Sequence, residues 1–476
     1  MDVLASVATG FGVALQPVNL LYCFIGVFIG TVVGVLPGIG PVSAMSLLLP
    51  LTLSGTPESG IIMMAGIYYG SMYGGSTTSI LINIPGEAAS VVTCLDGHEM
   101  AKQGRAGPAL GISALGSFIA GTLAIVALML VAPSLARVAV AFGPAEYFSL
   151  MMLGLTVLTF LTQGSMAKAL LMACVGVVLG LIGLDSITAQ PRLTFGRLEL
   201  IDGIGLVPVV MGLFGVAEVL SNIERPVTRD IIEARITRIL PGGGAVISSF
   251  ASYALEKRLS KTPERFGRGA IEGVAGPEAA NNAAAGGAFV PLMTLGIPPN
   301  VVMALLLGAF VVHGLQPGPL LMSQNPTLFW GIIASMYIGN VMLLVLNLPL
   351  IGMWVQLLRL PYNVLFPLIL LFSIIGVYCS GNNVFDVFVM MTVGVLGYLM
   401  RKFGYEPAPL VLAFVLGPML ENNLRKALIL SQGDLTTFFA RPISAACLIV
   451  AAALLAAPLL PKLRQQRNKV ALDETA

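Results

Sequence analysis

Apolar stretches long enough to cross a lipid bilayer recur along the whole chain, and they restrict its fold more than any other feature. A segment of about 17 to 25 apolar residues can span roughly 30 Å of hydrocarbon as a helix. Because a backbone in lipid must satisfy its own hydrogen bonds, such segments predict helices. They fit near 18–36, 109–132, 145–162, 166–184, 204–222, 300–315, 329–355, 362–379, 384–400, 406–420 and 442–460.

The chain has too few charged residues to cover a surface exposed to water. Asp, Glu, Lys and Arg make up 10% of its 476 residues, whereas soluble domains carry about 25%. The net charge of +2 is too small to indicate binding to a nucleic acid. The 54 glycines and 30 prolines are typical of interrupted membrane helices. We therefore predict an all-α polytopic membrane protein with about 10–12 transmembrane helices in a lipid bilayer.

Two segments interrupt the apolar pattern in the same way. Residues 68–86 read YYGSMYGGSTTSILINIPG, and residues 280–299 read ANNAAAGGAFVPLMTLGIPP. Each has a Gly-Gly pair, a short apolar run and then Ile-Pro; glycine permits unusual backbone angles, and proline removes a hydrogen-bond donor. Paired breaks of this kind in two half-chains point to the binding site of a secondary transporter. We expect two re-entrant hairpins, near 58–86 and 270–298.

The two halves of the chain resemble each other beyond these breaks. LPGIGP at 36–41 returns as LPGGGA at 240–245, and VPVVMGLFGVAEVL at 207–220 resembles APLVLAFVLGPMLENNL at 408–424. This pattern predicts a duplication, and we expect the repeats to be inverted. The predicted organisation is a first repeat at 1–225, a second at 226–430, and a final transmembrane helix and tail at 431–476.

Oxygen-bearing side chains gather at both breaks, where they suit a carboxylate and a small cation. Hydroxyls, side-chain amides and free carbonyls are hard ligands for sodium, and a half-helix N-terminus attracts an anion. The same side chains could instead bond their own helix and allow close packing. The predicted binding residues are Ser76, Thr77, Thr78, Ser79, Asn83, Pro85, Asn281, Asn282, Thr294, Pro298, Pro299 and Asn300. Sodium ligands are expected among Thr78, Asn83, Asn282 and Thr294, with Glu278 nearby on the second segment.

Other polar positions allow two interpretations each. The glycine-rich turns could line the transport path or could simply end a span; their residues are Gly38, Gly40, Gly242 and Gly243. Glu218 and Glu421 occupy matched positions at the ends of apolar runs. They could serve cation or proton coupling, or lie at the membrane interface.

Basic residues indicate the orientation in the membrane. The segment 223–268 and the tail 462–469 are rich in Lys and Arg. The positive-inside rule places both in the cytoplasm, so the C-terminus is expected there.

Missing motifs narrow the function. The sequence has no Walker A motif, no HExxH, no Cys/His ligand cluster and no nucleophile elbow. We therefore expect no enzyme and no cofactor other than Na⁺ or H⁺ as a coupling ion. A stand-alone cation/carboxylate symporter, a passive channel and a membrane enzyme remain alternatives to a carrier with partners.

Several long segments resemble the TctA family, the large membrane subunit of the tripartite tricarboxylate transporters. The resemblance runs from about residue 20 to 425. The segments that show the resemblance are LPGIGP with SLLLPLT (46–52), the segment 68–86, TCLDGHEMAKQGRAGPALG (93–111), GLDSITAQPRLTFG (183–196), GLFGVAEVL (212–220) and GPEAANNAAAGGAFVPLMTLGIP (276–298).

This resemblance implies a multi-pass permease of the bacterial inner membrane. It implies two partners, a small membrane subunit and a periplasmic solute-binding protein that delivers an organic carboxylate. It also implies uptake coupled to a sodium or proton gradient. The family pattern continues with Gly-Ser after the second Ile-Pro, where this chain has Pro299-Asn300.

Overall fold

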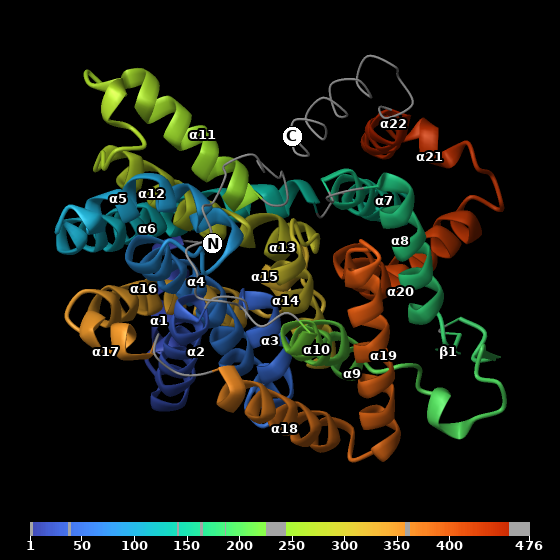
Figure 1. Ribbon diagram of the computed structural model, residues 1–476. Helices are drawn as coiled ribbons and strands as arrows, with labels where there is room; N and C mark the ends of the chain where they lie inside the picture. The colour runs from blue at the N-terminus through green and yellow to red at the C-terminus, as the bar shows by residue number, and fades with distance from the viewer. Residues whose placement is uncertain are drawn as a thin grey trace. The chain divides into compact units, whose positions relative to one another are not determined.

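Helices make up nearly all of the described part of the chain. The computed structural model describes residues 3–36, 40–139, 142–161, 165–185, 187–224, 244–357 and 362–456 (Figure 1). Among these residues the only sheet is the antiparallel pair β1 (Gly183–Leu184) and β2 (Pro191–Arg192), with Gly183 opposite Arg192. The predicted all-α class is confirmed.

The described residues form two compact units. The first takes in those of 1–139, 206–232 and 243–398, and the second those of 140–205 and 399–476. Both interrupted segments therefore belong to the first unit. The units cut across the predicted repeats, whose boundaries at 225 and 430 stay a prediction.

The first unit contains most of the helices. It comprises α1 (Val3–Ala14), α2 (Pro17–Val35), α3 (Gly40–Thr52), α4 (Pro57–Ile82), η1 (Ala88–Ser90), α5 (Val91–Lys102), α6 (Ala106–Ala139), α9 (Leu206–Val210), the π-helix η3 (Met211–Val216), α10 (Ala217–Glu224), α11 (Gly244–Leu259), η4 (Pro263–Arg265), α12 (Glu272–Gly287), α13 (Phe289–Leu295), α14 (Val301–Val312), α15 (Leu321–Gln324), α16 (Pro326–Asn347), α17 (Ile351–Leu357), α18 (Tyr362–Gly381) and α19 (Val384–Lys402), which runs on into the second unit.

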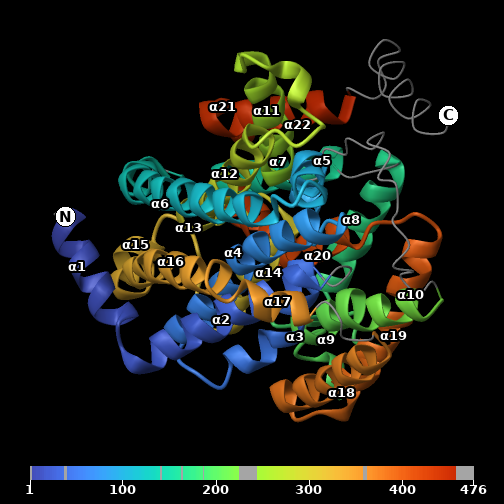
Figure 2. The same ribbon diagram turned by 60° about the vertical axis from the view of Figure 1, so that its left-hand side comes forward.

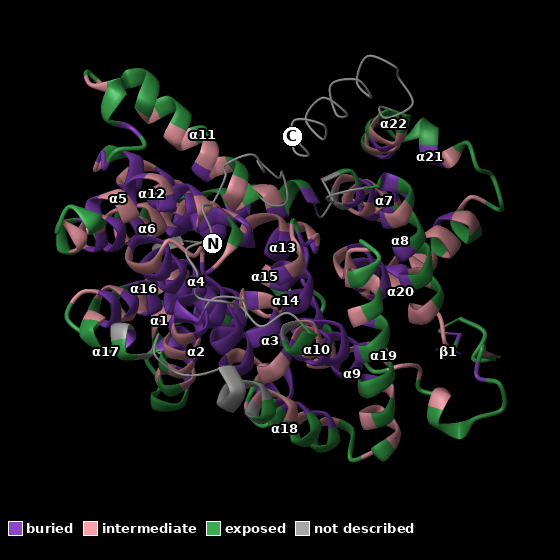
Figure 3. Ribbon diagram, viewed as in Figure 1, coloured by how far each residue is buried: buried purple, intermediate pink, exposed green. Residues whose placement is uncertain are grey.

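Helix α4 is the buried centre of this unit. Figures 1 and 2 place it among α2, α6 and α16, and Figure 3 shows it as buried along most of its length. Glycines on α2 and α4 let the two backbones touch: a Cβ on Gly30 would lie 2.6 Å from the Ile67 carbonyl oxygen, and one on Gly70 2.8 Å from that of Val27. Small residues at such spacing are the usual seam between membrane helices.

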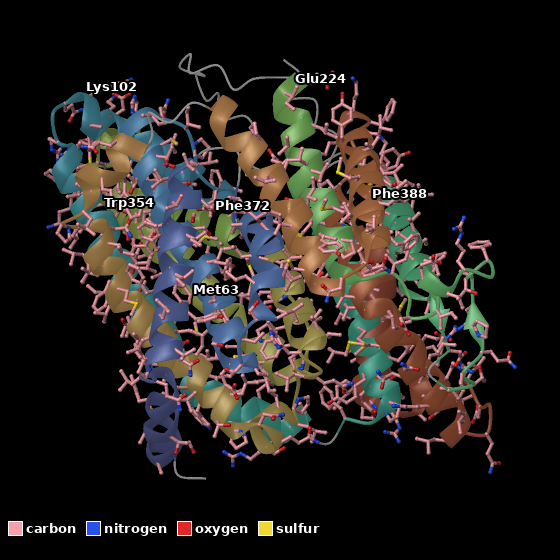
Figure 4. All side chains as sticks on the ribbon, turned by 90° about the horizontal axis from the view of Figure 1, so that it is seen from below. Met63, Lys102, Glu224, Trp354, Phe372 and Phe388 are labelled. Carbon is pink, nitrogen blue, oxygen red and sulfur yellow. The ribbon has the colours of Figure 1, made fainter. Side chains whose placement is uncertain are left out.

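Apolar side chains cover the outside of the same unit. Phe372 and Phe388 are 56% and 67% exposed, whereas Lys102 and Glu224 lie apart from each other along one edge and Met63 lies in the interior (Figure 4). Among the described helices, α2, α6, α16 and α19 are long and apolar enough to cross a membrane, and further apolar helices are shorter.

The structure corrects the predicted position of the breaks. Gly74 and Gly75 lie inside the continuous helix α4, and Gly74 is part of the seam with α2. The second pair, Gly286-Gly287, closes α12, and α13 resumes after the single residue Ala288. Neither segment folds back on itself at its glycines, because a glycine that faces a neighbouring backbone serves packing and leaves the helical ladder intact.

The helical breaks lie instead at the Ile-Pro pairs, where α4 and α13 end with the same local geometry. Asn83 has a φ of 58° and Gly296 a φ of 72°, both in the left-handed region that ends helices. Each is followed by Ile-Pro and then by a helix whose first turn is capped by a side chain. The sequence therefore predicted the existence of two matched breaks, and local sterics placed them a few residues later.

The second unit is a smaller set of helices. It comprises α7 (Pro144–Leu161), α8 (Met166–Gly180), η2 (Leu198–Leu200), α20 (Pro407–Leu430), α21 (Thr437–Ala440) and α22 (Pro442–Ala456), with the β1–β2 loop. Gly176 on α8 faces the backbone of Leu410 on α20 so closely that a Cβ would clash with it. This seam repeats the small-residue packing of the first unit.

Candidate functional site

The hydroxyls of the first segment all lie on α4 and are buried, but they point to different partners. Ser76 bonds the carboxylate of Glu278 on α12. Thr78 donates to the Val35 carbonyl oxygen at 2.9 Å, which fastens α4 to the end of α2. Ser79 donates to the Gly75 carbonyl oxygen at 2.9 Å and to Ser90 at 3.0 Å. Thr77 is buried beside them.

The polar residues of the second segment face these hydroxyls from α12. Asn282 donates through Nδ2 to Ser117 on α6 at 2.7 Å and to the carbonyl oxygen of Glu278 at 3.1 Å. Glu278 also accepts from Thr93 on α5. Because α4, α5, α6 and α12 each supply a member, this cluster depends on tertiary packing and not on either segment alone.

Glu87 closes the first break. Its Oε2 accepts from the backbone N–H of Ala89 at 2.7 Å, and its Oε1 accepts from Asn281 Nδ2 at 3.0 Å. A carboxylate is thus held at a helix N-terminus by one amide N–H and one side-chain amide, as helix-terminus electrostatics favour. The remaining amide oxygen of Asn281, Oδ1, is buried and has no hydrogen-bond partner.

Asn300 performs the same role at the second break. Its Oδ1 accepts from the N–H of Met303 at 2.9 Å and so caps α14, while its Nδ2 donates to the Tyr68 hydroxyl at 3.2 Å. Glu87 also lies beside α4, because a Cβ on Gly75 would lie 2.9 Å from the Glu87 Cγ. Both capped helix starts therefore contact α4, where the Tyr68 ring packs 6.3 Å from that of Phe289.

Other predicted residues have different roles. Thr294 donates to the carbonyl oxygen of Val290, four residues earlier, at 2.6 Å. Asn83 supplies the left-handed residue of the first break, while Pro85, Pro298 and Pro299 lie in the connecting turns. Among the described residues, no hydrogen bond joins any two of the four expected sodium ligands, Thr78, Asn83, Asn282 and Thr294.

The glycine turns give one observation. Gly40 has a φ of 68° at the start of α3, where a left-handed backbone favours glycine. The expectations for Gly38, Gly242 and Gly243 lie outside the described residues, as do part of the basic segment 223–268 and the C-terminal tail from 457.

Sequence reasoning missed Glu87 and undervalued Glu278. Glu87 follows Ile-Pro-Gly directly, and an acid at a helix start is a known capping signal. Glu278 stands three and four residues before Asn281 and Asn282, so all three fall on one side of α12. That spacing was the available signal.

A separate cavity of about 190 Å³ lies elsewhere in the first unit. It is apolar apart from Ser43 and Glu218, and α2, α3, η3, α10 and α18 supply its walls. Ser43 donates to the Phe214 carbonyl oxygen of the π-helix at 3.1 Å. A π-helix inside a longer helix frequently marks a functional position, but this cavity contains none of the predicted binding residues.

Comparison with known proteins decides the family. The tripartite tricarboxylate transporter TctA family matches residues 20–412, which is most of the chain and includes both breaks. The chain belongs to the TctA family. It is therefore a multi-pass component of a transport system, and the resemblance found in its sequence segments is confirmed.

Two relatives of this TctA chain come from Agrobacterium vitis. One is 51% identical over 500 residues that cover the whole of both chains, and is described as an "Uncharacterized 52.8 kDa protein in TAR-I ttuC' 3'region". The other, described as an "Uncharacterized protein in TAR-II ttuC' 3'region", is 55% identical over 236 residues, covering 50% of this chain and 98% of its own length. No solved structure matches the TctA chain.

Proposed function

We propose that this TctA chain is the permease of a cation-coupled transporter for organic carboxylates, fed by a binding protein. The observation that supports this most is the pair of matched helix breaks that both contact α4, Glu87 beside Gly75 and Asn300 at Tyr68. One break already holds a carboxylate, that of Glu87, on a helix N-terminus. A carboxylate substrate needs the same kind of partner, and the Asn300-capped start of α14 offers it from the other break.

A cation or proton would complete the chemistry of this site. Asn281 Oδ1 is a buried acceptor without a donor, and leaving such an atom unpaired costs about 1–3 kcal/mol. A bound sodium ion or a protonated group could satisfy it. The sodium set drawn from Thr78, Asn83, Asn282 and Thr294 remains a proposal that needs a rearrangement of the hydrogen bonds these residues now make.

The proposed partners are a small membrane subunit and a periplasmic binding protein. The basic segment 223–268 indicates a cytoplasmic side. Residues 206–224 run through α9, η3 and α10, about 28 Å at 1.5 Å per residue, which is close to a membrane crossing. The segment 183–200, which contains β1, β2 and η2, would then face the periplasm, where the exposed side chains of Phe195 and Leu198 would meet the binding protein.

Reconstitution of the complete system tests this proposal. The chain, its small membrane subunit and its binding protein would be placed in vesicles, and uptake of radiolabelled citrate followed under sodium and proton gradients, with unlabelled mono-, di- and tricarboxylates as competitors. We expect saturable, gradient-driven uptake that stops when the binding protein is left out. Full uptake without the binding protein would support the stand-alone symporter. Uptake whose rate does not depend on the sodium or the proton gradient would exclude a coupled carrier.

A variant of the second break locates the site. Asn300→Ala removes both the cap of α14 and the bond to Tyr68, so we expect a higher KM for citrate. Asn423→Ala is the matched control, because Asn423 only bonds the carbonyl oxygen of Met419 on its own helix. An unchanged KM in Asn300→Ala would remove the second break from the substrate site.

A further inference from the structure

The carboxyl group of Glu278 is fully buried and is met by hydroxyls from two other helices. Ser76 on α4 bonds its Oε2, and Thr93 on α5 bonds its Oε1. Within the described residues it makes no ion pair with Lys, Arg or His. Burial of a charged carboxylate without a cation is expensive, so such a group tends toward its neutral, protonated form.

The hydrogen bonds around Glu278 can satisfy both protonation states. Ser76 Oγ lies 3.1 Å from the Met72 carbonyl oxygen as well as beside Glu278 Oε2, and a hydroxyl has one proton to donate. When Glu278 is ionised, Ser76 and Thr93 each donate to one carboxylate oxygen. When Glu278 is protonated on Oε2, that proton is donated to Ser76 Oγ, and Ser76 turns its own proton to Met72.

We propose that Glu278 binds and releases the coupling proton of this transporter, with the Ser76 hydroxyl reversing its direction between the two states. The step is a simple protonation: the carboxylate takes one proton from water on one side of the membrane and returns it on the other, with no other bond made or broken. This inference rests on the proposed function and adds the identity of the ion and its carrier.

The other acids near Glu278 are met mainly by N–H donors. Asp96 on α5 accepts three backbone N–H bonds, from Gly267, Gly269 and Ala270, and a fourth bond from the Tyr253 hydroxyl. Glu87 accepts only from N–H donors. An N–H donor cannot accept a hydrogen bond from a protonated acid, so among these contacts only the Tyr253 hydroxyl could do so.

Helix α11, which packs against α12, carries Lys257 and Arg258 in its last turn, but no described Lys, Arg or His makes an ion pair with Glu278. Helix α6 carries only Arg137 in its last turn, and α13 carries no charged residue. The titratable groups that face Glu278 or the adjoining turns of α12 are Tyr73, Glu87, Cys94, Asp96, Tyr253 and Glu256.

A second observation places an unfilled acceptor beside this group. Asn281 Oδ1, three residues further along α12, is buried and has no donor, while its Nδ2 bonds Glu87. Glu278 is thereby connected through one turn of α12 to the carboxylate that caps the first break. Protonation of Glu278 lowers the negative charge next to the site proposed for the anionic substrate, which is the sign that co-transport of a proton and an anion requires.

Infrared difference spectroscopy tests the proton directly, without any substrate. With the full chain in lipid vesicles, we expect the carbonyl band of a protonated carboxylic acid to weaken as pH rises, and this change to be lost in Glu278→Gln. Glu99→Gln, an exposed acid paired with Lys102 at 2.9 Å, should keep it. A pH-dependent band that survives in Glu278→Gln, or a wild-type protein without one, would overturn the assignment.

The same method tests the role of Ser76. Ser76→Ala removes the acceptor of the acid proton, so the band should move to higher frequency. Ser335→Ala is the matched control, because Ser335 is a buried hydroxyl that bonds only the Ile332 carbonyl oxygen on its own helix. An unmoved band in Ser76→Ala would show that Ser76 does not take part.

Transport then tests coupling in the complete three-subunit system. Glu278→Gln should lose uphill citrate uptake driven by a proton gradient but keep citrate exchange at equal pH, because a permanently neutral side chain allows loaded movement only. Retained uphill uptake would contradict the proposal, and so would a sodium-driven uptake that Glu278→Gln abolishes. If the wild type moves no carboxylate, the proposed function fails, while the infrared result still decides whether Glu278 takes up a proton.

Discussion

Two acidic residues of this chain are held by opposite means, Glu278 in the first unit and Asp185 in the second. Hydroxyls alone surround Glu278. Asp185 lies in the β1–β2 loop and meets Arg192 at 3.0 Å and Arg425 at 2.7 Å. Its Oδ1 also accepts from the backbone N–H groups of Ile187 and Thr188 at 2.7 and 2.9 Å.

The difference shows how surroundings decide what an acid can do. Bonds from Thr188, Arg425, Ile187 and Arg192 hold the pKa of Asp185 well below its usual value of 3.8, so it stays ionised and fixes the loop. Hydroxyls can donate or accept, so they leave both states open to Glu278. A fixed charge suits a scaffold, and a changeable one suits transport.

Thr93→Val should have the largest effect on this comparison. The substitution keeps the shape but leaves Glu278 Oε1 without its donor, which costs about 1–3 kcal/mol when the group is buried. We expect loss of gradient-driven citrate uptake and a thermal unfolding temperature several degrees lower in detergent. Thr156→Val is the control, since Thr156 bonds only Met152 on its own helix. Equal effects of the two variants would contradict a special role for Thr93.

Asp185→Asn should have a smaller, local effect. The amide keeps an oxygen for the turn but loses the charge that holds Arg192 and Arg425, so the segment that follows β2 should be cut faster by trypsin at Arg197. Citrate exchange should change little if the loop serves only as a scaffold. An uncut segment would show that the backbone bonds suffice.

The same variant gives a pH dependence with a definite sign. Because the folded-state pKa of Asp185 lies below its usual value of 3.8, its contribution to stability is present above about pH 4. It is lost as pH falls further, through the folded-state pKa. The thermal unfolding temperature, measured between pH 5 and pH 2, should therefore fall more steeply with decreasing pH for the wild type than for Asp185→Asn. Parallel curves would contradict the assignment.

The smallest effect is expected from Glu421→Gln and from salt. Glu421 contacts Arg192 at 2.8 Å and Arg425 at 3.2 Å at a partly exposed position, where ion pairs contribute little. In 1 M NaCl, where charges are screened beyond about 3 Å, the segment that follows β2 should be cut somewhat faster, while the infrared band of Glu278 should not move. A salt-sensitive band would place Glu278 in contact with bulk solvent.

Glu421 also resolves an alternative left open by the sequence. Its matched position with Glu218 allowed either a coupling role or an interfacial one. In the structure Glu421 joins Arg192 and Arg425 in the second unit, which favours the interfacial role, whereas Glu218 borders the apolar cavity. Sequence spacing could not separate the two, because Arg192, one of the partners of Glu421, lies 229 positions away in the chain.

The candidate site was predictable only in part. Asn281, Asn282, Asn300 and Ser76 were found because polar residues beside Gly and Pro stand out in an apolar chain. Gly74 was misjudged, since a packing glycine and a breaking glycine look the same in sequence and differ only in what faces them.

The sequence by itself determined that the chain folds in a membrane and that its helices are interrupted at the two Ile-Pro pairs. Low charge and repeated apolar stretches require a membrane, and the steric limits of Ile-Pro after a left-handed residue end a helix wherever they occur. Tertiary structure alone decided the chemistry: Ser76 and Thr93 reach Glu278 from 202 and 185 positions away. Whether an acid meets hydroxyls or arginines depends on which helices pack together, and short-range sequence patterns do not encode that.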